Sequence, residues 1–478
     1  MRKQDFALEV QELLKLYAAH PQVTALDTLL KNDTSRNIFL KGLNGSGPAM
    51  TIASLFTKGR GSYVCVLNDQ EEAGYFYHDL MQLTASDEVY FFPSAYRRAI
   101  KYGHVDPANE ILRTEVLSRL QDPDASFVIV TYPDALAERV VAREVLKENT
   151  LKISVGEKLD NMFVSDVLDE YGFEQVDYVY EPGQYALRGS ILDVFSFSNE
   201  FPYRIDFFGD EVETIRTFDV ETQLSKEKLD SIYIVPEMSK NAMDSTSLLG
   251  SLPRNTCIAA RDLAWCKERI GSVWNDDPVV ADEESFADID QMRKKLVRGE
   301  DFLREVLDFR RIHFGVRPMG TADATIHFST QTQPIYHKNF DRVSESFHKY
   351  LDEGYTLYIL SDQEKQANRI RMIFEDRGDN IPFTAVNRTI HEGFADDTLR
   401  ICFFTDHQLF DRFHKFNLKS DKARSGKITL SLKELNQFSQ GDYIVHIDHG
   451  VGQFGGLVRT EVNGKMQEAI KLIYQNND

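Results

Sequence analysis

Residues 37–49 read NIFLKGLNGSGPA, and this stretch indicates the fold class of the chain. The apolar run at residues 37–41 is typical of a short buried strand, and a helical pattern begins near Ala49. Gly42, Gly45 and Gly47 lie between the two elements. A glycine-rich turn from a strand into a helix is where nucleotide-binding α/β proteins place their phosphate loop. We therefore expect a Rossmann-like, ATPase-like domain with a parallel sheet.

The loop lacks the two side chains that would make it a nucleotide site. Gly42 and Gly47 keep the spacing of G-x-x-x-x-G-K-[ST], but Pro48 replaces the lysine and Ala49 replaces the hydroxyl residue. The lysine would contact the β- and γ-phosphates, the hydroxyl would hold Mg²⁺, and Pro48 also removes a backbone N–H. Three interpretations stay open: a degenerate nucleotide site, which we favour, a structural turn, or a working site.

The same alternation of short strands and helices extends over residues 1–149. Strands are predicted at residues 63–67, 89–92 and 127–130, and helices at residues 49–56 and 110–120. Residues 237–322 return to a helical pattern, with a helix predicted over residues 285–311. We expect this second part to complete the same α/β domain.

Residues 150–236 have a different pattern and predict an inserted α+β domain. A helical pattern at residues 164–171 precedes strand-like runs at residues 190–196, 203–208 and 211–218. The runs are too close for helices between them, so an antiparallel meander is expected. Its arginines alternate with acids, which is typical either of a salt-bridged solvated face or of a protein-recognition face.

The remaining chain divides into three further parts. Residues 323–416 predict a second, small α/β domain, and residues 417–437 predict a linker. Six Lys or Arg and one acid occur in residues 414–433, which we interpret as a solvated linker rather than a nucleic-acid arm. Residues 438–478 predict a β unit with a hairpin at Asn463-Gly464. The pattern stops inside this unit, so we expect a fragment that ends within a small barrel, and the family resemblance given below implies that this barrel is Tudor-like.

Composition excludes several classes of function. The chain has 55 Lys+Arg and 75 Asp+Glu, a formal charge of −20, which disfavours autonomous binding to duplex DNA. No apolar run reaches the length needed to span a bilayer, so no membrane association is expected. The four cysteines lack metal or redox spacing and predict buried thiols in a cytoplasmic protein. His446, Asp448 and His449 lack a further nearby ligand, so no metal site is expected.

Two long motifs resemble a known family. EPGQYALRGSILDVF at residues 181–195 and PYRIDFFGDEVETIRTFD at residues 202–219 are similar to the UvrA-binding segment shared by UvrB and the bacterial transcription-repair coupling factors. Pro48-Ala49 departs from UvrB, which needs its lysine for ATP, and the interval between residues 93 and 104 is too short for UvrB's DNA-clamping hairpin. FSQGDYIVHIDHGVGQFGGL at residues 438–457 resembles the start of the RNA-polymerase-interacting domain of the coupling factors.

The resemblance implies binding residues at matching positions. Arg188 stands where the family places a UvrA-contacting arginine, and Arg204 and Phe195 are weaker candidates on the same meander. The family binds the RNA polymerase β subunit through an edge strand, which implies residues 469–474 here, with Ile470 and Leu472 as apolar anchors. Ordinary β core remains the alternative for both sets.

The resemblance further implies an adaptor that recruits UvrA to stalled RNA polymerase in transcription-coupled nucleotide excision repair. Its parent would be an ATP-dependent DNA translocase whose motor, with its ATP and Mg²⁺, lies beyond residue 478. We expect no catalytic residue, metal or cofactor in this chain, and weak or no contact with duplex DNA. The alternatives are a UvrB-type ATPase of the excision nuclease and a DNA-binding repair module that uses the basic run.

Overall fold

The structure is a computed structural model, and most of the chain can be described from it. It describes residues 9–32, 35–59, 61–95, 107–122, 124–220, 222–236, 245–275, 293–414, 416, 441–446, 450–462 and 465–474. The chain forms two compact units, residues 1–421 and residues 422–478. Each unit is described by itself.

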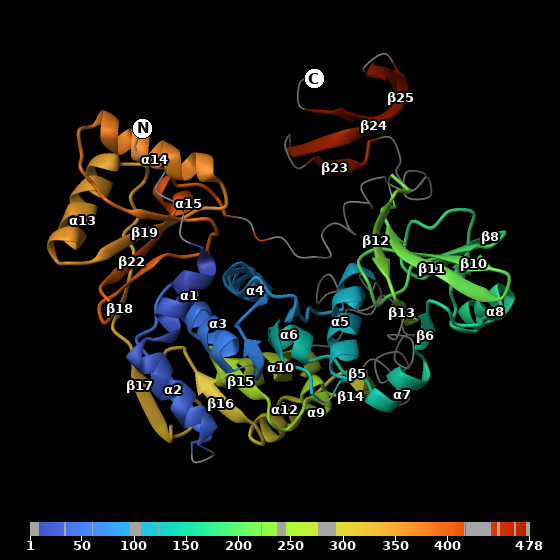
Figure 1. Cartoon of the computed structure of the whole chain (residues 1–478), viewed down its shortest axis with the longest axis horizontal. Helices are drawn as coiled ribbons and strands as arrows, with labels where there is room; N and C mark the ends of the chain where they lie inside the picture. Colours follow the sequence, from blue (N-terminus) through green and yellow to red (C-terminus); the bar gives the residue numbers. More distant parts are fainter. Residues whose placement is uncertain are drawn as a thin grey trace. The chain divides into compact units, whose positions relative to one another are not determined.

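A seven-stranded sheet forms the centre of the first unit, and all its strands are parallel (Figure 1). In spatial order the strands are β17 (Ala324–His327), β1 (Asn37–Lys41), β16 (Arg310–His313), β15 (Cys257–Ala260), β2 (Ser62–Val66), β4 (Phe127–Thr131) and β3 (Val89–Phe91). The predicted parallel α/β domain is confirmed. Its last strand in chain order, β17, begins at Ala324, just beyond the expected domain boundary at residue 322.

Helices connect these strands, because parallel neighbours need a crossover between them. They are α1 (Val10–Ala18), α2 (Pro21–Lys31), α3 (Gly47–Gly59), α4 (Gln70–Thr84), α5 (Pro107–Arg119), α6 (Pro133–Leu136), α7 (Arg143–Glu148), α9 (Leu248–Ser251), α10 (Leu263–Asn275) and α12 (Gly299–Val306). A short pair, β5 (Val140–Val141) and β14 (Ser245–Thr246), is antiparallel. Strands from both sides of the insertion therefore share one sheet and one hydrophobic core.

The predicted helix over residues 285–311 is wrong at its end. Residues 310–313 form β16, which lies between β1 and β15 in the sheet. The sequence RRIH hides this strand because two arginines interrupt its apolar pattern. Arg311 is 8% exposed, and its Nη1 donates to the carbonyl oxygens of Leu307 at 2.9 Å and Phe309 at 3.0 Å. The turn that leads into the strand thus provides acceptors for Nη1 of this buried arginine.

The inserted domain contains a six-stranded sheet with one helix. Its spatial order is β12 (Ser225–Leu229), β11 (Glu211–Phe218), β10 (Tyr203–Phe208), β9 (Ile191–Val194), β8 (Gln184–Arg188) and β7 (Glu174–Gln175). β8 to β12 form the predicted antiparallel meander, but β7 pairs with β8 in parallel. β6 (Leu151–Ser154) pairs with β13 (Ser231–Ile234), and α8 (Asn161–Glu170) contributes Val164 and Leu168 to a separate core.

The small α/β domain has a mixed sheet rather than a purely parallel one. Its order is β18 (Thr330–Thr332), β21 (Phe394–Asp396), β22 (Ile401–Thr405), β19 (Thr356–Leu360) and β20 (Thr384–Val386). β21 is antiparallel to both of its neighbours. The helices are α13 (Phe340–Asp352), α14 (Glu364–Asp376) and α15 (Asp406–Leu409), so the predicted strand–helix–strand unit is present.

The second unit shows a three-stranded antiparallel sheet, and its described residues form no closed barrel. The strands are β23 (Tyr443–His446), β24 (Gly450–Val462) and β25 (Lys465–Ile473). Val462 pairs with Lys465 on either side of the predicted hairpin at residues 463–464. The turn residues themselves, Asp448, His449 and residues 417–437 of the expected linker lie outside the described residues.

Two further expectations concern the described residues. Cys65, Cys257, Cys266 and Cys402 are free and buried, as predicted. In the described part of the chain, no helix combines the length and the apolar character that crossing a membrane requires.

Candidate phosphate loop and partner-binding surface

The glycine-rich turn between β1 and α3 is shaped by close backbone contacts. Gly42 has φ +89°, and a Cβ atom there would lie 2.3 Å from the carbonyl oxygen of Phe328. Gly45 has φ +53°, and a Cβ atom there would lie 2.8 Å from the carbonyl oxygen of Gly393. Both positions therefore need glycine for conformation and for space, whether or not a phosphate binds.

The helix start that would receive a phosphate carries no suitable side chain. Pro48 and Ala49 lie in the first turn of α3, and Ala49 is fully buried. The backbone N–H of Ser46 donates to the carbonyl oxygen of Glu392 at 3.0 Å. One of the donors that would face a phosphate is thus already used within the chain.

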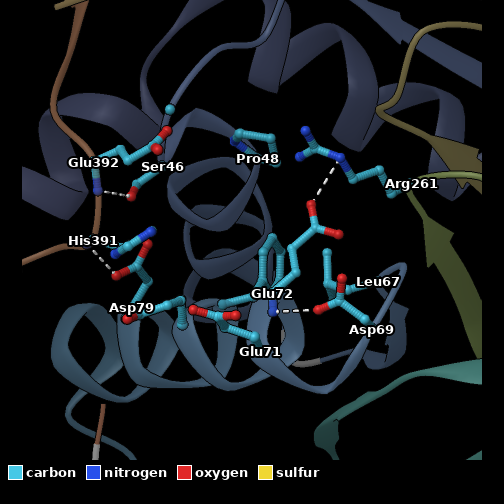
Figure 2. Close-up of a pocket in the computed structure, with 13 residues that line it drawn as sticks. Ser46, Pro48, Leu67, Asp69, Glu71, Glu72, Asp79, Arg261, His391 and Glu392 are labelled. Atoms are coloured by element: carbon cyan, nitrogen blue, oxygen red, sulfur yellow. Dashed lines mark hydrogen bonds and ion pairs between the residues drawn. The ribbon is translucent and has the colours of Figure 1, made fainter. Parts of the chain in front are cut away.

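Acidic side chains dominate the pocket beside this loop (Figure 2). The acids that line it are Asp69, Glu71, Glu72, Asp79 and Glu392. Arg261 is the only arginine or lysine among the described lining residues, and its Nε lies 2.8 Å from Glu72 Oε1. Burial raises the pKa of Glu72, and it raises the pKa of Asp79 to about 7. A triphosphate entering here would meet mostly like charge, which favours the degenerate-site interpretation over a working site.

Two arginines of the inserted domain share one buried carboxylate. Asp193, on β9, is fully buried. Arg204 binds it through two hydrogen bonds, Nε to Oδ1 at 2.7 Å and Nη2 to Oδ2 at 2.8 Å, and Arg188 Nη2 also contacts Oδ2. The hydrogen bond to Asp193 raises the pKa of Arg204 further above its usual value. Two positive charges and one negative charge leave a net positive charge at this position.

The two arginines differ in how far they reach solvent. The Arg188 side chain is 35% exposed, lies over the Tyr178 ring at 5.0 Å and donates to the carbonyl oxygen of Asp177. Arg204 is 15% exposed and lies over the Phe218 ring at 4.2 Å. Arg188 therefore reaches solvent, whereas Arg204 mainly fixes Asp193.

Phe195 does not lie on this surface. It is 2% exposed, so its expected contact with a partner protein is not retained. Phe208, which follows Phe207 at the end of β10, is 79% exposed. Side chains alternate along β10, so Phe208 lies on the face opposite the buried Phe207. This alternation could have identified Phe208 as an exposed aromatic residue from the sequence. Tyr178 and Tyr180 are also exposed, at 53% and 59%.

Ile470 and Leu472, which the resemblance implies as RNA-polymerase-binding residues, both belong to β25. Leu472 pairs with Phe454 of β24 and is partly buried, and Ile470 pairs with Leu457. The side chain of Ile470 lies outside what the structure describes. β25 pairs with β24 on one side, and no further strand pairs with it among the described residues. Its other backbone edge could accept an additional strand.

Comparison with known proteins identifies two domain families in the chain. The UvrB interaction domain matches residues 151–239, and the CarD-like/TRCF RID domain matches residues 438–478. Transcription-repair-coupling factors from Staphylococcus aureus strain USA300 and Bacillus subtilis strain 168 are each 23% identical to the chain. The alignments cover 95% and 92% of this chain but only 46% and 43% of those proteins.

The resemblance expected from the two long motifs is therefore confirmed. The chain is similar to the N-terminal half of the coupling factors and spans less than half of their length. The UvrB interaction domain coincides closely with the expected insertion at residues 150–236, and the second family begins at the expected residue 438.

Proposed function

We propose that this chain is the adaptor part of a transcription-repair coupling factor. In this proposal the inserted domain binds UvrA, and residues 438–478 bind the RNA polymerase β subunit. The chain thereby recruits UvrA to stalled polymerase in the cytoplasm. A motor outside this chain supplies the ATP-dependent translocation on DNA.

The observation that carries the UvrA proposal is the arginine pair on Asp193. The buried carboxylate holds Arg188 at the surface beside Tyr178, and the exposed Phe208 belongs to the same sheet. Arginine and aromatic side chains contribute most to the affinity of many protein interfaces. We propose Arg188 and Phe208 as direct contacts and Arg204 as the residue that positions Arg188 through Asp193.

Calorimetric titration with purified UvrA tests this site. Arg188→Glu and Phe208→Ser should each weaken binding by at least about tenfold, as expected for residues at the centre of an interface. Phe208→Ser separates binding from folding, because a side chain that is 79% exposed contributes little to the core. Arg254→Glu is the matched control. Arg254 is 79% exposed in the α/β domain that surrounds the insertion, and it pairs with the exposed Asp308. Unchanged affinity in both surface variants would contradict the site.

The polymerase proposal rests on β25 and on the match to the CarD-like/TRCF RID domain. Leu472→Asp should weaken capture of the isolated polymerase β subunit by at least about tenfold, because it puts a charge at an apolar position of β25. Lys471→Asp is the control, since its exposed neighbouring position alternates to the other face of the strand. Equal loss in the two variants would argue for a purely electrostatic contact.

The alternative of a UvrB-type ATPase is disfavoured by the acidic pocket and by the Ser46–Glu392 hydrogen bond. Titration of the intact chain with ATP and Mg²⁺ checks this. Binding at micromolar ATP that Gly47→Arg abolishes would restore the enzyme hypothesis.

A further inference from the structure

Residues 391–393 of the small α/β domain lie across the mouth of the phosphate loop (Figure 2). Ser46 N–H donates to the Glu392 carbonyl oxygen at 3.0 Å, and Glu392 N–H donates to Ser46 Oγ at 3.0 Å. His391 N–H donates to Asp79 Oδ1 at 2.6 Å. Gly45 and Gly393 are close enough that a Cβ atom on Gly45 would clash. This segment of the chain therefore forms one side of the pocket and engages Ser46 of the loop.

Two further residues, His414 and Phe416, pack against α4 beside the first segment. The Tyr75 hydroxyl donates to the His414 carbonyl oxygen at 2.8 Å, and the Phe416 ring meets the Tyr75 ring edge-on at 4.9 Å. The His391 ring stacks on Tyr75 with 3.6 Å between ring centroids. Tyr75 therefore holds both segments.

Four histidines gather where these segments meet α4 and α15. The ring centroid of His414 lies 4.2 Å from that of His407, 5.1 Å from that of His78 and 5.8 Å from that of His391. His78 Nε2, His391 Nδ1 and His414 Nδ1 are buried without a hydrogen-bond partner. Because the rings stack rather than converge, they are poorly arranged to share one metal ion, but each can bind a proton.

We propose that this histidine cluster is a pH-sensitive latch. At neutral pH its uncharged, closely packed rings hold residues 391–393, His414 and Phe416 against α4 and the phosphate loop. In mild acid the histidines bind protons more readily when released than when packed together, so protonation shifts the equilibrium toward release of both segments.

Few charged groups lie near the cluster, and they do not all favour protonation of its histidines. Asp406 lies 3.9 Å from His407 Nδ1 and favours its protonation, but its other oxygen is engaged by Arg412. Asp79 on α4 and Glu392 on the loop are the acids nearest His391. Two further acids lie near the cluster. Glu71 raises the pKa of Tyr75. The pKa of Asp362 is raised by Asp406 and lowered by Arg388.

The direction of the pH dependence follows from the pKa values of these groups. Burial, and then the neighbouring histidines, lower the pKa of His78, His391 and His407 to about 4. Burial also lowers the pKa of His414. Released histidines recover a pKa of about 6.5, so the released state binds more protons. The latch is fully stable above about pH 6.5 and is lost as the pH falls toward 4.

Asp79 opposes this effect and limits its size. Its pKa of about 7 in the closed state means that closure takes up a proton at this carboxyl. Between pH 7.5 and 5.5, each of three histidines favours release by about tenfold, and Asp79 favours closure by roughly 25-fold. The net shift is therefore tens-fold toward release.

Hydrogen–deuterium exchange of the intact chain at pH 7.5 and 5.5, corrected for intrinsic exchange rates, tests the latch. The amides of residues 391–393, which donate hydrogen bonds in the closed state, should lose protection by at least about tenfold at pH 5.5. The buried strand β4 serves as the internal reference and should stay protected. A variant with His78→Gln, His391→Phe and His414→Phe keeps only His407 and Asp79, whose opposite effects no longer favour release, so its protection should not fall at pH 5.5.

His348→Gln is the matched control, because His348 is exposed on α13 and outside the cluster. It should retain the full pH response. Should the triple variant fail to fold, His414→Phe alone replaces the central ring and should reduce the response. Unchanged protection of residues 391–393 at pH 5.5 in the wild-type chain would overturn the proposal. An undiminished response in the histidine variants would overturn it equally.

Discussion

Asp193 shows how one buried residue can organise a surface. Its carboxylate is buried, and the guanidinium groups of Arg188 and Arg204 balance its negative charge. Removing a partner of a buried charge costs more than removing a solvent-exposed ion pair. The two arginines should therefore separate by function, with stability depending mainly on Arg204 and recognition mainly on Arg188.

Arg204→Ala should lower the free energy of unfolding of the inserted domain by about 3 kcal/mol, because it leaves Asp193 with only a half-exposed partner. Arg216→Ala is the comparison, since its partner Asp206 is partly exposed. That change should cost less than about 1 kcal/mol. Urea unfolding followed by exchange of the β9 and β10 amides measures both. If the two variants lost the same free energy of unfolding, the buried charge of Asp193 would not need Arg204 for its stabilisation.

The buried cysteines allow a second test at the residue scale. Burial raises the pKa of Cys257 to about 12, and it also raises the pKa of Cys65. The reactive thiolate is therefore almost absent in the folded chain. Iodoacetamide at pH 8 should label none of the four cysteines until urea unfolds the chain. Rapid labelling of Cys65 under native conditions would contradict its placement in the central sheet.

At the scale of elements, restoring the missing side chains of the phosphate loop should not restore nucleotide binding. A Pro48→Lys, Ala49→Thr variant recovers the motif but keeps the acidic pocket and the Glu392 contact with Ser46. We expect no ATP binding up to about millimolar concentration, where an interaction is worth only about 4 kcal/mol. Titration calorimetry, with circular dichroism to verify folding, measures this. Clear binding would show that the two side chains alone had been limiting.

The sequence predicted elements well where local pattern and tertiary context agree. The runs that became β1, β2, β4 and β10 are short, apolar or alternating, and bounded by turn residues, as strands require. β16 was missed because its two arginines are satisfied only by contacts that form in the folded chain. Phe195 was expected at the surface but is buried, because burial depends on which face of the sheet the core covers. The His78–His414 contact joins residues far apart in sequence, so no local pattern could reveal it.

At the scale of the whole molecule, the division after residue 421 predicts separable functions. A chain that ends at Asp421 retains the inserted domain and should bind UvrA within about twofold of the full chain. It should lose all binding to the polymerase β subunit, because β23 to β25 are removed. Calorimetry and capture assays on the same preparations measure both. Weakened UvrA binding would show that the second unit contributes to that interface.

The net charge of −20 sets the expectation for DNA. The chain should not shift a duplex at about 150 mM salt, because the electrostatic contribution to binding is then screened and the overall field is repulsive. A gel-shift series over salt concentration measures this. Salt-sensitive binding that disappears on Lys→Ala changes in residues 414–433 would instead support a DNA-binding arm.

The tight turn at Gly42 and Gly45 has a consequence for how related sequences are interpreted. Both glycines are required by the neighbouring carbonyl oxygens of Phe328 and Gly393. Selection would thus preserve them in descendants that never meet a nucleotide. Across an evolutionary lineage, persistence of this glycine pattern would record the fit between two parts of one polypeptide. It would be a poor guide to which members hydrolyse ATP.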